Sequence, residues 1–238
     1  MPRFSEIIDE LKKDQVPEDS EWLPVSDLMS GLMILFMFIA ISLILETRKA
    51  AETYQENHQQ IYEALVKEFR PDLQRMGAEI DPKTLTIIFN HQDILFETGK
   101  SELRQSYRNT LSNFFPRYMA VINKYKQSIE EVRIEGHTSS EWASGISQDV
   151  AYFENMRLSQ DRTRAVLNYV YNLNQVAEYR PWMKIHLAAV GLSSAKTIQT
   201  DNYKEDKEKS KRVTFRIVTN ADAQIRKILE GKSDAGDK

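Results

Sequence analysis

The chain has 238 residues, of which 28% are charged, and a formal net charge of -3. It carries no basic excess of the kind that marks nucleic-acid-binding domains, so we expect no direct nucleic-acid partner. It also contains no cysteine, which excludes a disulfide framework, a thiol nucleophile and a cysteine metal site.

One apolar segment near the N-terminus predicts a membrane-spanning helix. A charged arm, residues 1–21, precedes it, and the 18 residues from Leu28 to Leu45 are interrupted only by Ser30, Gly31 and Ser42. At the rise of an α-helix such a run covers about 27 Å, close to the roughly 30 Å hydrocarbon core of a bilayer. The flank at 18–21 is acidic, whereas a cleavable signal peptide has a basic flank. We predict one retained transmembrane helix over residues 22–46.

A carboxylate, Asp27, stands where this span begins. An acid in hydrocarbon costs about 2.5–3.5 kcal/mol, and such groups usually face a bundle interior or an ion path. On a helix Asp27, Ser30 and Gly31 share one face. The pattern favours Asp27 as an ion-translocating residue for protons or sodium ions. The alternative is that Asp27 caps a helix that begins at Leu28.

Residues 47–80 are predicted to form a helical stalk. Apolar residues recur there every three or four positions, and Pro71 predicts a break. A stalk is the simpler interpretation of this stripe, and a partner-contacting or pore-plugging helix is the alternative. The apolar positions are Ile61, Leu65, Phe69, Leu73 and Met76.

The remainder predicts an α+β domain over residues 81–220, followed by a tail, 221–238. Alternating apolar residues predict strands, and periodic ones predict helices, the first with Ser101 as its N-cap. The expected order is β-α-β-α-β-β, a sandwich of helices on one face of a small mixed sheet. The strands are expected at 84–90, 131–138, 184–191 and 212–219, and the helices at 101–125 and 155–173.

Three motifs in this domain carry a family resemblance. "VRIEGHTSS", "NMRLSQDRTRAVLNYV" and "KSKRVTFRI" occur in this order. Together they resemble the OmpA-like peptidoglycan-binding domain, in which a strand ends in Gly-His-Thr-Asp, a helix begins Asn-x-x-Leu-Ser-x-x-Arg and a final strand starts with Arg-Val. The resemblance spans roughly Thr84 to Thr219.

The resemblance implies a peptidoglycan-binding site. The matching positions are Thr138, Ser139, Asn155, Leu158 and Arg162. In the family, the Arg and the Asp after Gly-His-Thr contact the charged ends of the peptidoglycan peptide. Here Ser139 replaces that Asp, so Glu141 or another acid would have to act in its place. The alternative is that these residues only stabilise the fold.

An acid-bearing span followed by such a domain resembles MotB-type stator subunits, and "SDLMSGLMILF" is similar to their Asp-containing helix. Departures around that motif favour the related ZorB subunits of Zorya anti-phage systems. The resemblance implies a homodimer inside a ring of MotA-like or ZorA-like membrane proteins. It also implies an inner-membrane location, with the N-terminus in the cytoplasm and the C-terminal domain in the periplasm.

Two other functions stay open at this point: a flagellar MotB stator subunit, and a passive protein that anchors the membrane to peptidoglycan. The four histidines show no metal-ligand spacing, so we expect no metal and no cofactor beyond the translocated ion. No phosphate-binding loop or nucleophile motif is present, so we expect no enzyme.

Overall fold

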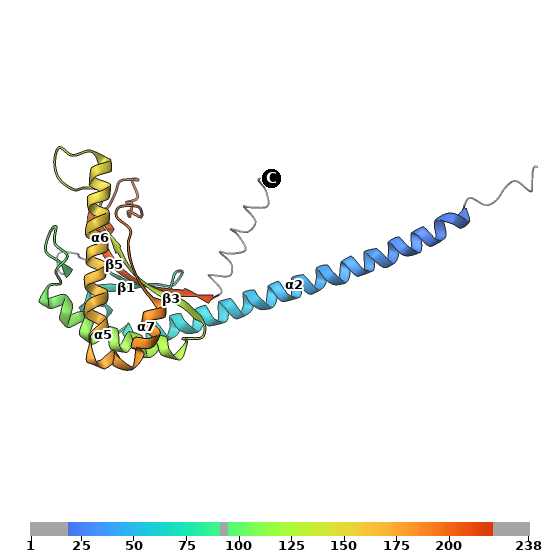
Figure 1. Ribbon diagram of the computed structural model, residues 1–238, viewed down its shortest axis with the longest axis horizontal. Coiled ribbons are helices and arrows are strands. Elements are labelled where there is room, and N and C mark those ends of the chain that lie inside the picture. Colours follow the sequence, from blue (N-terminus) through green and yellow to red (C-terminus); the bar gives the residue numbers. More distant parts are fainter. Residues whose placement is uncertain (1–18, 91–94, 221–238) are drawn as a thin grey trace, which may run out of the picture. The chain divides into compact units, whose positions relative to one another are not determined.

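The computed structural model describes residues 19–90 and 95–220 (Figure 1). The chain divides into two compact units, Met1–Thr53 and Tyr54–Lys238. Residues 1–18 of the expected arm and the expected tail, 221–238, lie outside the described residues.

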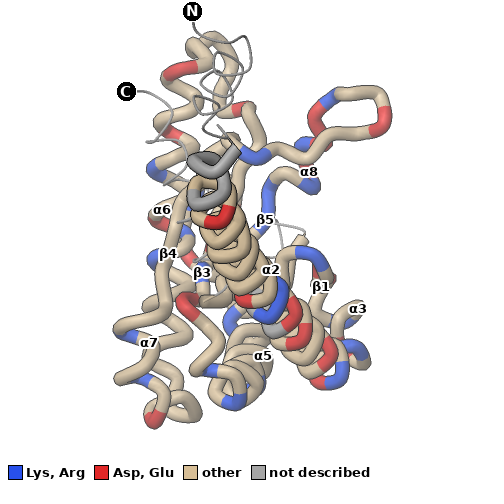
Figure 2. Tube along the Cα trace, turned by 90° about the vertical axis from the view of Figure 1, so that its right-hand side faces the viewer, with Lys and Arg blue, Asp and Glu red and all other residues tan. Residues whose placement is uncertain are grey.

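Helix α2, Asp19–Phe69, contains the apolar segment of the first unit. The part that is long and apolar enough to cross a membrane is Val25–Lys49. Figure 2 shows it as a tan stretch along α2 between charged positions. Its apolar side chains are exposed, as lipid-facing residues must be in a single helix.

Within the second unit, the end of α2 packs on the core. Ile61, Leu65 and Phe69 are fully buried there. This part of the predicted stripe therefore contacts the chain's own domain, which argues against a free partner-contacting or pore-plugging face. The helix ends before Pro71, as expected, and a short helix, α3 (Leu73–Met76), follows.

The second unit is built on a five-stranded sheet with the order β1-β2-β5-β3-β4. Strands β3 and β4 are parallel, and the other neighbouring pairs are antiparallel. The strands are β1 (Ala78–Asp81), β2 (Thr86–Phe89), β3 (Ile129–His137), β4 (Leu187–Gly191) and β5 (Arg212–Thr219).

Helices α5 (Gln105–Lys124) and α6 (Gln148–Tyr171) cover the same face of this sheet. Phe215 of β5 meets the aromatic rings of Phe114 and Tyr118 on α5. Phe215 pairs with Ile134 on β3, and Gly136, two residues further along that strand, lies against α6. Opposed and alternate residues share one sheet face, so both helices lie on it. The expected α+β sandwich is confirmed.

The sequence prediction missed strand β1. The residues around Gly77 and Asp81 were expected to be the end of the stalk and the beginning of the domain, yet Ala78–Asp81 pairs with β2. The observed order is therefore β-β-α-β-α-β-β. Four residues are too few for alternation to distinguish a strand from a loop.

Three element boundaries also differ from the prediction. Helix α5 begins at Gln105 and not at Ser101, because Leu103 is buried and pairs with Phe96 in an isolated bridge. Helix α6 begins at Gln148 and not at Asn155, since the Ser147 hydroxyl caps its first turn by accepting from the Val150 N–H.

The third boundary is that of β4. Residues expected at the start of this strand, 184–186, belong instead to a short helix, α7 (Arg180–His186), which has a proline in its first turn. Proline is favoured at that position because its missing N–H would have no helical partner there.

Candidate functional site

The approach of α6 to the sheet determines the geometry of the site. A Cβ added to Gly136 would lie 2.8 Å from the Ser159 carbonyl oxygen, and one added to Gly191 would lie 2.5 Å from the Gln160 backbone nitrogen. Both strand ends therefore need glycine, because α6 backbone occupies the space of a side chain. This contact brings the first half of α6 beside the residues that follow β3.

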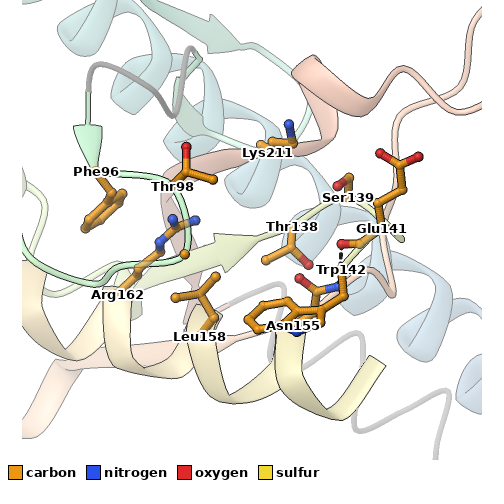
Figure 3. A pocket seen from close by; sticks show the side chains of 11 residues that line it. Phe96, Thr98, Thr138, Ser139, Glu141, Trp142, Asn155, Leu158, Arg162 and Lys211 are labelled. Carbon is orange, nitrogen blue, oxygen red and sulfur yellow. Dashed lines mark hydrogen bonds between the residues drawn. The ribbon is translucent and has the colours of Figure 1, made fainter. Parts of the chain in front are cut away.

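A pocket of about 230 Å³ lies between these elements (Figure 3). All five residues expected to bind peptidoglycan line it: Thr138, Ser139, Asn155, Leu158 and Arg162. The remaining walls come from elsewhere in the chain, with Phe96, Thr98 and Gly99 before α5, Glu141 and Trp142 after β3, and Lys211 before β5.

Arg162 holds one wall of this pocket. Its Nε donates to the Lys100 carbonyl oxygen at 2.8 Å and its Nη2 to the Glu97 carbonyl oxygen at 3.3 Å. The guanidinium carbon lies 4.8 Å from the centre of the Phe96 ring. The side chain is only 4% exposed. Arg162 thus fixes the turn that carries Thr98 and Gly99, and it also places a positive charge at the pocket wall.

Asn155 holds the opposite wall, since its Nδ2 donates to the Glu141 carbonyl oxygen at 3.1 Å. The dashed line in Figure 3 marks this bond between α6 and the loop after β3. The Asn and the Arg of the helix motif therefore each tie a different loop to α6.

Thr138 and Ser139 form the buried floor, each with 3% of its surface exposed. The Thr138 N–H donates to the Ser193 carbonyl oxygen at 3.0 Å, and the Ser193 N–H donates to the Ser159 hydroxyl at 3.1 Å. These bonds join the end of β3, the loop after β4 and α6. The Thr138 hydroxyl oxygen is buried and has no hydrogen-bond partner among the described residues, an arrangement that suits a bound polar ligand.

Two charged side chains, Glu141 and Lys211, lie at the rim of the pocket, and the sequence prediction considered only the first. Glu141 was considered as a substitute acid; it lines the pocket, but its carboxylate accepts from the Lys207 ammonium. Lys211 pairs with Glu208 at 2.9 Å and was not expected at the site. Its place beside the Arg-Val pair of the last motif was the available signal.

His137, the residue before this floor, is also buried. Its Nε2 lies 3.6 Å from Glu135 Oε2, and both side chains are less than 10% exposed. Burial lowers the pKa of His137 below its usual value, because the charged imidazolium loses its hydration. Among the described residues, no group of three or more histidine or carboxylate side chains could hold a metal ion.

Asp27 lies in the other unit, eight residues after α2 begins at Asp19. It therefore does not cap the helix, and that alternative is wrong. Its helical setting places Ser30 and Gly31 on the same face. The Ser30 hydroxyl donates to the Ser26 carbonyl oxygen at 2.7 Å, and a Cβ added to Gly31 would meet no described residue outside the nearby backbone of its own helix within 4 Å.

Comparison with known proteins shows the family to which the chain belongs. The chain is 48% identical to the Zorya protein ZorB of Escherichia coli over 226 residues, which is 92% of this chain and 95% of that protein. The chain belongs to the ZorB family. Residues 95–211 of this ZorB family member also match the OmpA family, and that range contains all five predicted pocket residues.

Solved structures with a similar fold are more distant. A MotB-like protein from Desulfovibrio vulgaris has a TM-score of 0.48 at 17% identity, covering 73% of this ZorB family member and 98% of that chain. The cell wall anchor of the type VI secretion system from Pseudomonas aeruginosa has a TM-score of 0.42 at 15% identity, covering 66% of this chain and 97% of its own.

Proposed function

We propose that this protein is an ion-driven stator subunit of the bacterial inner membrane that also holds the cell wall. One observation carries the proposal: an acid-bearing apolar helix and a domain whose five motif residues line one pocket occur in a single chain. Asp27 carries protons or sodium ions past a MotA-like or ZorA-like ring, and the pocket binds peptidoglycan. The working form is a homodimer with its N-terminus in the cytoplasm and its second unit in the periplasm.

The physical link between the two activities is force. A unit charge that crosses 100 mV releases about 2.3 kcal/mol, which can drive a conformational cycle. Rotation does work only if one partner is held still, and a wall-bound periplasmic domain supplies that fixed point. A passive anchor would need the pocket but would have no use for Asp27.

Family membership supports anti-phage defence rather than flagellar motility as the setting, since the 48% identical relative is a Zorya protein. The test is a phage infection assay in cells that carry the full set of neighbouring genes. We expect Asp27→Asn to abolish protection while the variant still assembles with its ring partner, because an amide cannot carry a proton. Full protection by Asp27→Asn at matched expression would refute ion carriage.

The wall contact is tested separately with the purified full chain in detergent and isolated peptidoglycan. We expect the wild type to sediment with peptidoglycan and Arg162→Ala to bind about tenfold to a hundredfold more weakly, the loss expected for a charge-assisted contact. Thermal unfolding of both proteins is the control, because Arg162 also holds a turn. Wild-type protein that stays in the supernatant would refute wall binding.

A further inference from the structure

Among the described residues, the floor of the pocket carries no acid. Thr138, Ser139 and Asn155 are each 3% exposed and uncharged at neutral pH, and the buried charged group, Arg162, is a cation. In Figure 3 Arg162 lies on the Phe96 side of Thr138, whereas Ser139 and Glu141 lie on the other side. A ligand with a carboxylate at one end and an amine at the other would therefore place its amine beside Ser139 and Glu141.

Glu141 is poorly placed to recognise an ammonium group. Its side chain is 62% exposed and its carboxylate already contacts the Lys207 ammonium. Exposed ion pairs of this kind contribute about 0–1 kcal/mol, because water screens the charges. Lys211, the other charged side chain among the described rim residues, is a cation and repels an ammonium.

Ser139 cannot distinguish an ammonium group from an amide either. Its hydroxyl can accept a hydrogen bond from an ammonium N–H or from an amide N–H, whereas a carboxylate would strongly favour the ammonium. The exposure of Glu141 shows that this end of the pocket opens to solvent. An acyl group on the amine can therefore project outward.

We propose that the pocket recognises the carboxylate end of a wall peptide and does not distinguish a free amine from an acylated one. The second amine of the peptidoglycan diamino acid is free in uncross-linked stem peptides and acylated in cross-linked ones. The pocket thus accepts cross-linked peptidoglycan, the load-bearing part of the wall. This inference rests on the proposed wall binding and specifies its ligand.

The experiment compares two synthetic stem tripeptides that end in diaminopimelate, one with its side-chain amine free and one with that amine acetylated. Calorimetry with the full chain in detergent measures both affinities, and sedimentation with peptidoglycan runs in parallel. We expect the two affinities to agree within about twofold, because Glu141, the acid among the described lining residues, is exposed and screened by water. A third peptide, amidated at its diaminopimelate carboxylates, is expected to bind about tenfold more weakly.

Variants at two positions sharpen the result. Ser139→Asp should favour the free amine by about tenfold, since it places a carboxylate on the floor. Ser139→Asn is the matched control: it has the same shape without the charge and should leave the two affinities equal. Glu141→Gln should also leave them equal.

A tenfold preference of the wild type for the free amine would overturn the inference, and its loss in Glu141→Gln would identify the acid responsible. If the protein sediments with peptidoglycan but binds neither peptide, the inference is also overturned, because the pocket would then not bind the carboxylate. If neither peptide nor peptidoglycan is bound, the proposed wall binding itself fails.

Discussion

At the scale of single residues, the side chains that line the pocket also support the loops around it. Arg162 and Asn155 both line the pocket, and both donate hydrogen bonds to backbone carbonyl groups of separate loops. Side chains that are buried and fixed in this way lose little conformational entropy when a ligand binds, so the pocket is largely preorganised.

The first prediction concerns Arg162→Lys. Lysine retains the positive charge but lacks the planar fork that reaches the Glu97 and Lys100 carbonyl groups together. We expect affinity for peptidoglycan intermediate between wild type and Arg162→Ala, and faster hydrogen exchange of the Lys100 amide, which bonds to the Glu97 carbonyl oxygen at 2.9 Å. Unchanged exchange would show that Arg162 does not hold this turn.

The motif sequence was sufficient to predict five of the side chains that meet at the pocket, but it could not predict the other lining residues or how each is used. The spacing of Asn155, Leu158 and Arg162 places them on one helix face, which is a local property. The bonds from Arg162 to residues 97 and 100 join positions more than sixty apart. The pairing of Glu141 with Lys207 is equally long-range, and no local pattern indicates it.

At the scale of elements, the closeness of α6 to the sheet is the feature on which the pocket depends. Gly191 lies where β4 meets α6. A methyl group there would lie too close to the Gln160 backbone nitrogen, which can move only if α6 moves with it. Overpacking of this kind costs about 1–3 kcal/mol.

We therefore predict that Gly191→Ala lowers the free energy of unfolding by about 1–3 kcal/mol and weakens peptidoglycan binding, because α6 must shift away from Thr138. Denaturant titration and sedimentation with peptidoglycan measure the two effects. Ala189→Ser, at an exposed position of the same strand, is the control and should change neither. Normal stability in Gly191→Ala would mean that the helix adjusts without cost.

The junction of α2 and α5 depends on Arg117. Its Nε donates to Glu68 Oε1 at 2.6 Å, its Nη2 to the Glu68 carbonyl oxygen at 2.7 Å and its Nη1 to Asp72 Oδ2 at 2.7 Å. This group satisfies carbonyl and carboxylate oxygens where α2 ends, and it ties that end to the core.

This junction predicts an acid sensitivity. The hydrogen bond from Arg117 holds the pKa of Asp72 below its unfolded value of 3.8. A lowered folded pKa contributes stability that is fully present above the unfolded value and is lost as the pH falls through the folded value. We expect Asp72→Asn to reduce the free energy of unfolding at pH 7 and to flatten its fall below about pH 4. Parallel pH profiles for wild type and variant would contradict this.

Element boundaries were predictable where a local signal exists and not where a distant contact decides. Pro71 stopped α2 as expected, and the strongly alternating strands β3 and β5 were correctly placed. Helix α5 begins late because Leu103 pairs with Phe96, a contact that depends on the fold. Strand β1 exists because β2 offers it an edge, and its four residues carry little signal of their own.

At the scale of the whole molecule, two units with different solvents share one chain. The first unit exposes a long apolar helix, which is unfavourable in water, and the second unit buries a hydrophobic core. Helix α2 belongs to both units.

The division into two units predicts that ion carriage and wall binding are separable. Because Asp27 lies in the first unit and the pocket wholly in the second, we expect Asp27→Asn to leave affinity for peptidoglycan within about twofold of wild type, since no pocket contact is touched. Conversely, Arg162→Ala should leave the ion flux of the ring complex in liposomes intact.

Both variants should lose phage protection, Asp27→Asn because no ion flux drives the motor and Arg162→Ala because the motor is not held to the wall. Ser42→Ala, a small polar change in the same apolar segment, serves as the matched control for insertion and should retain protection. Ion flux that persists in Asp27→Asn would place the ion path elsewhere, and protection that survives Arg162→Ala, with wall binding lost, would show that the motor works without the wall.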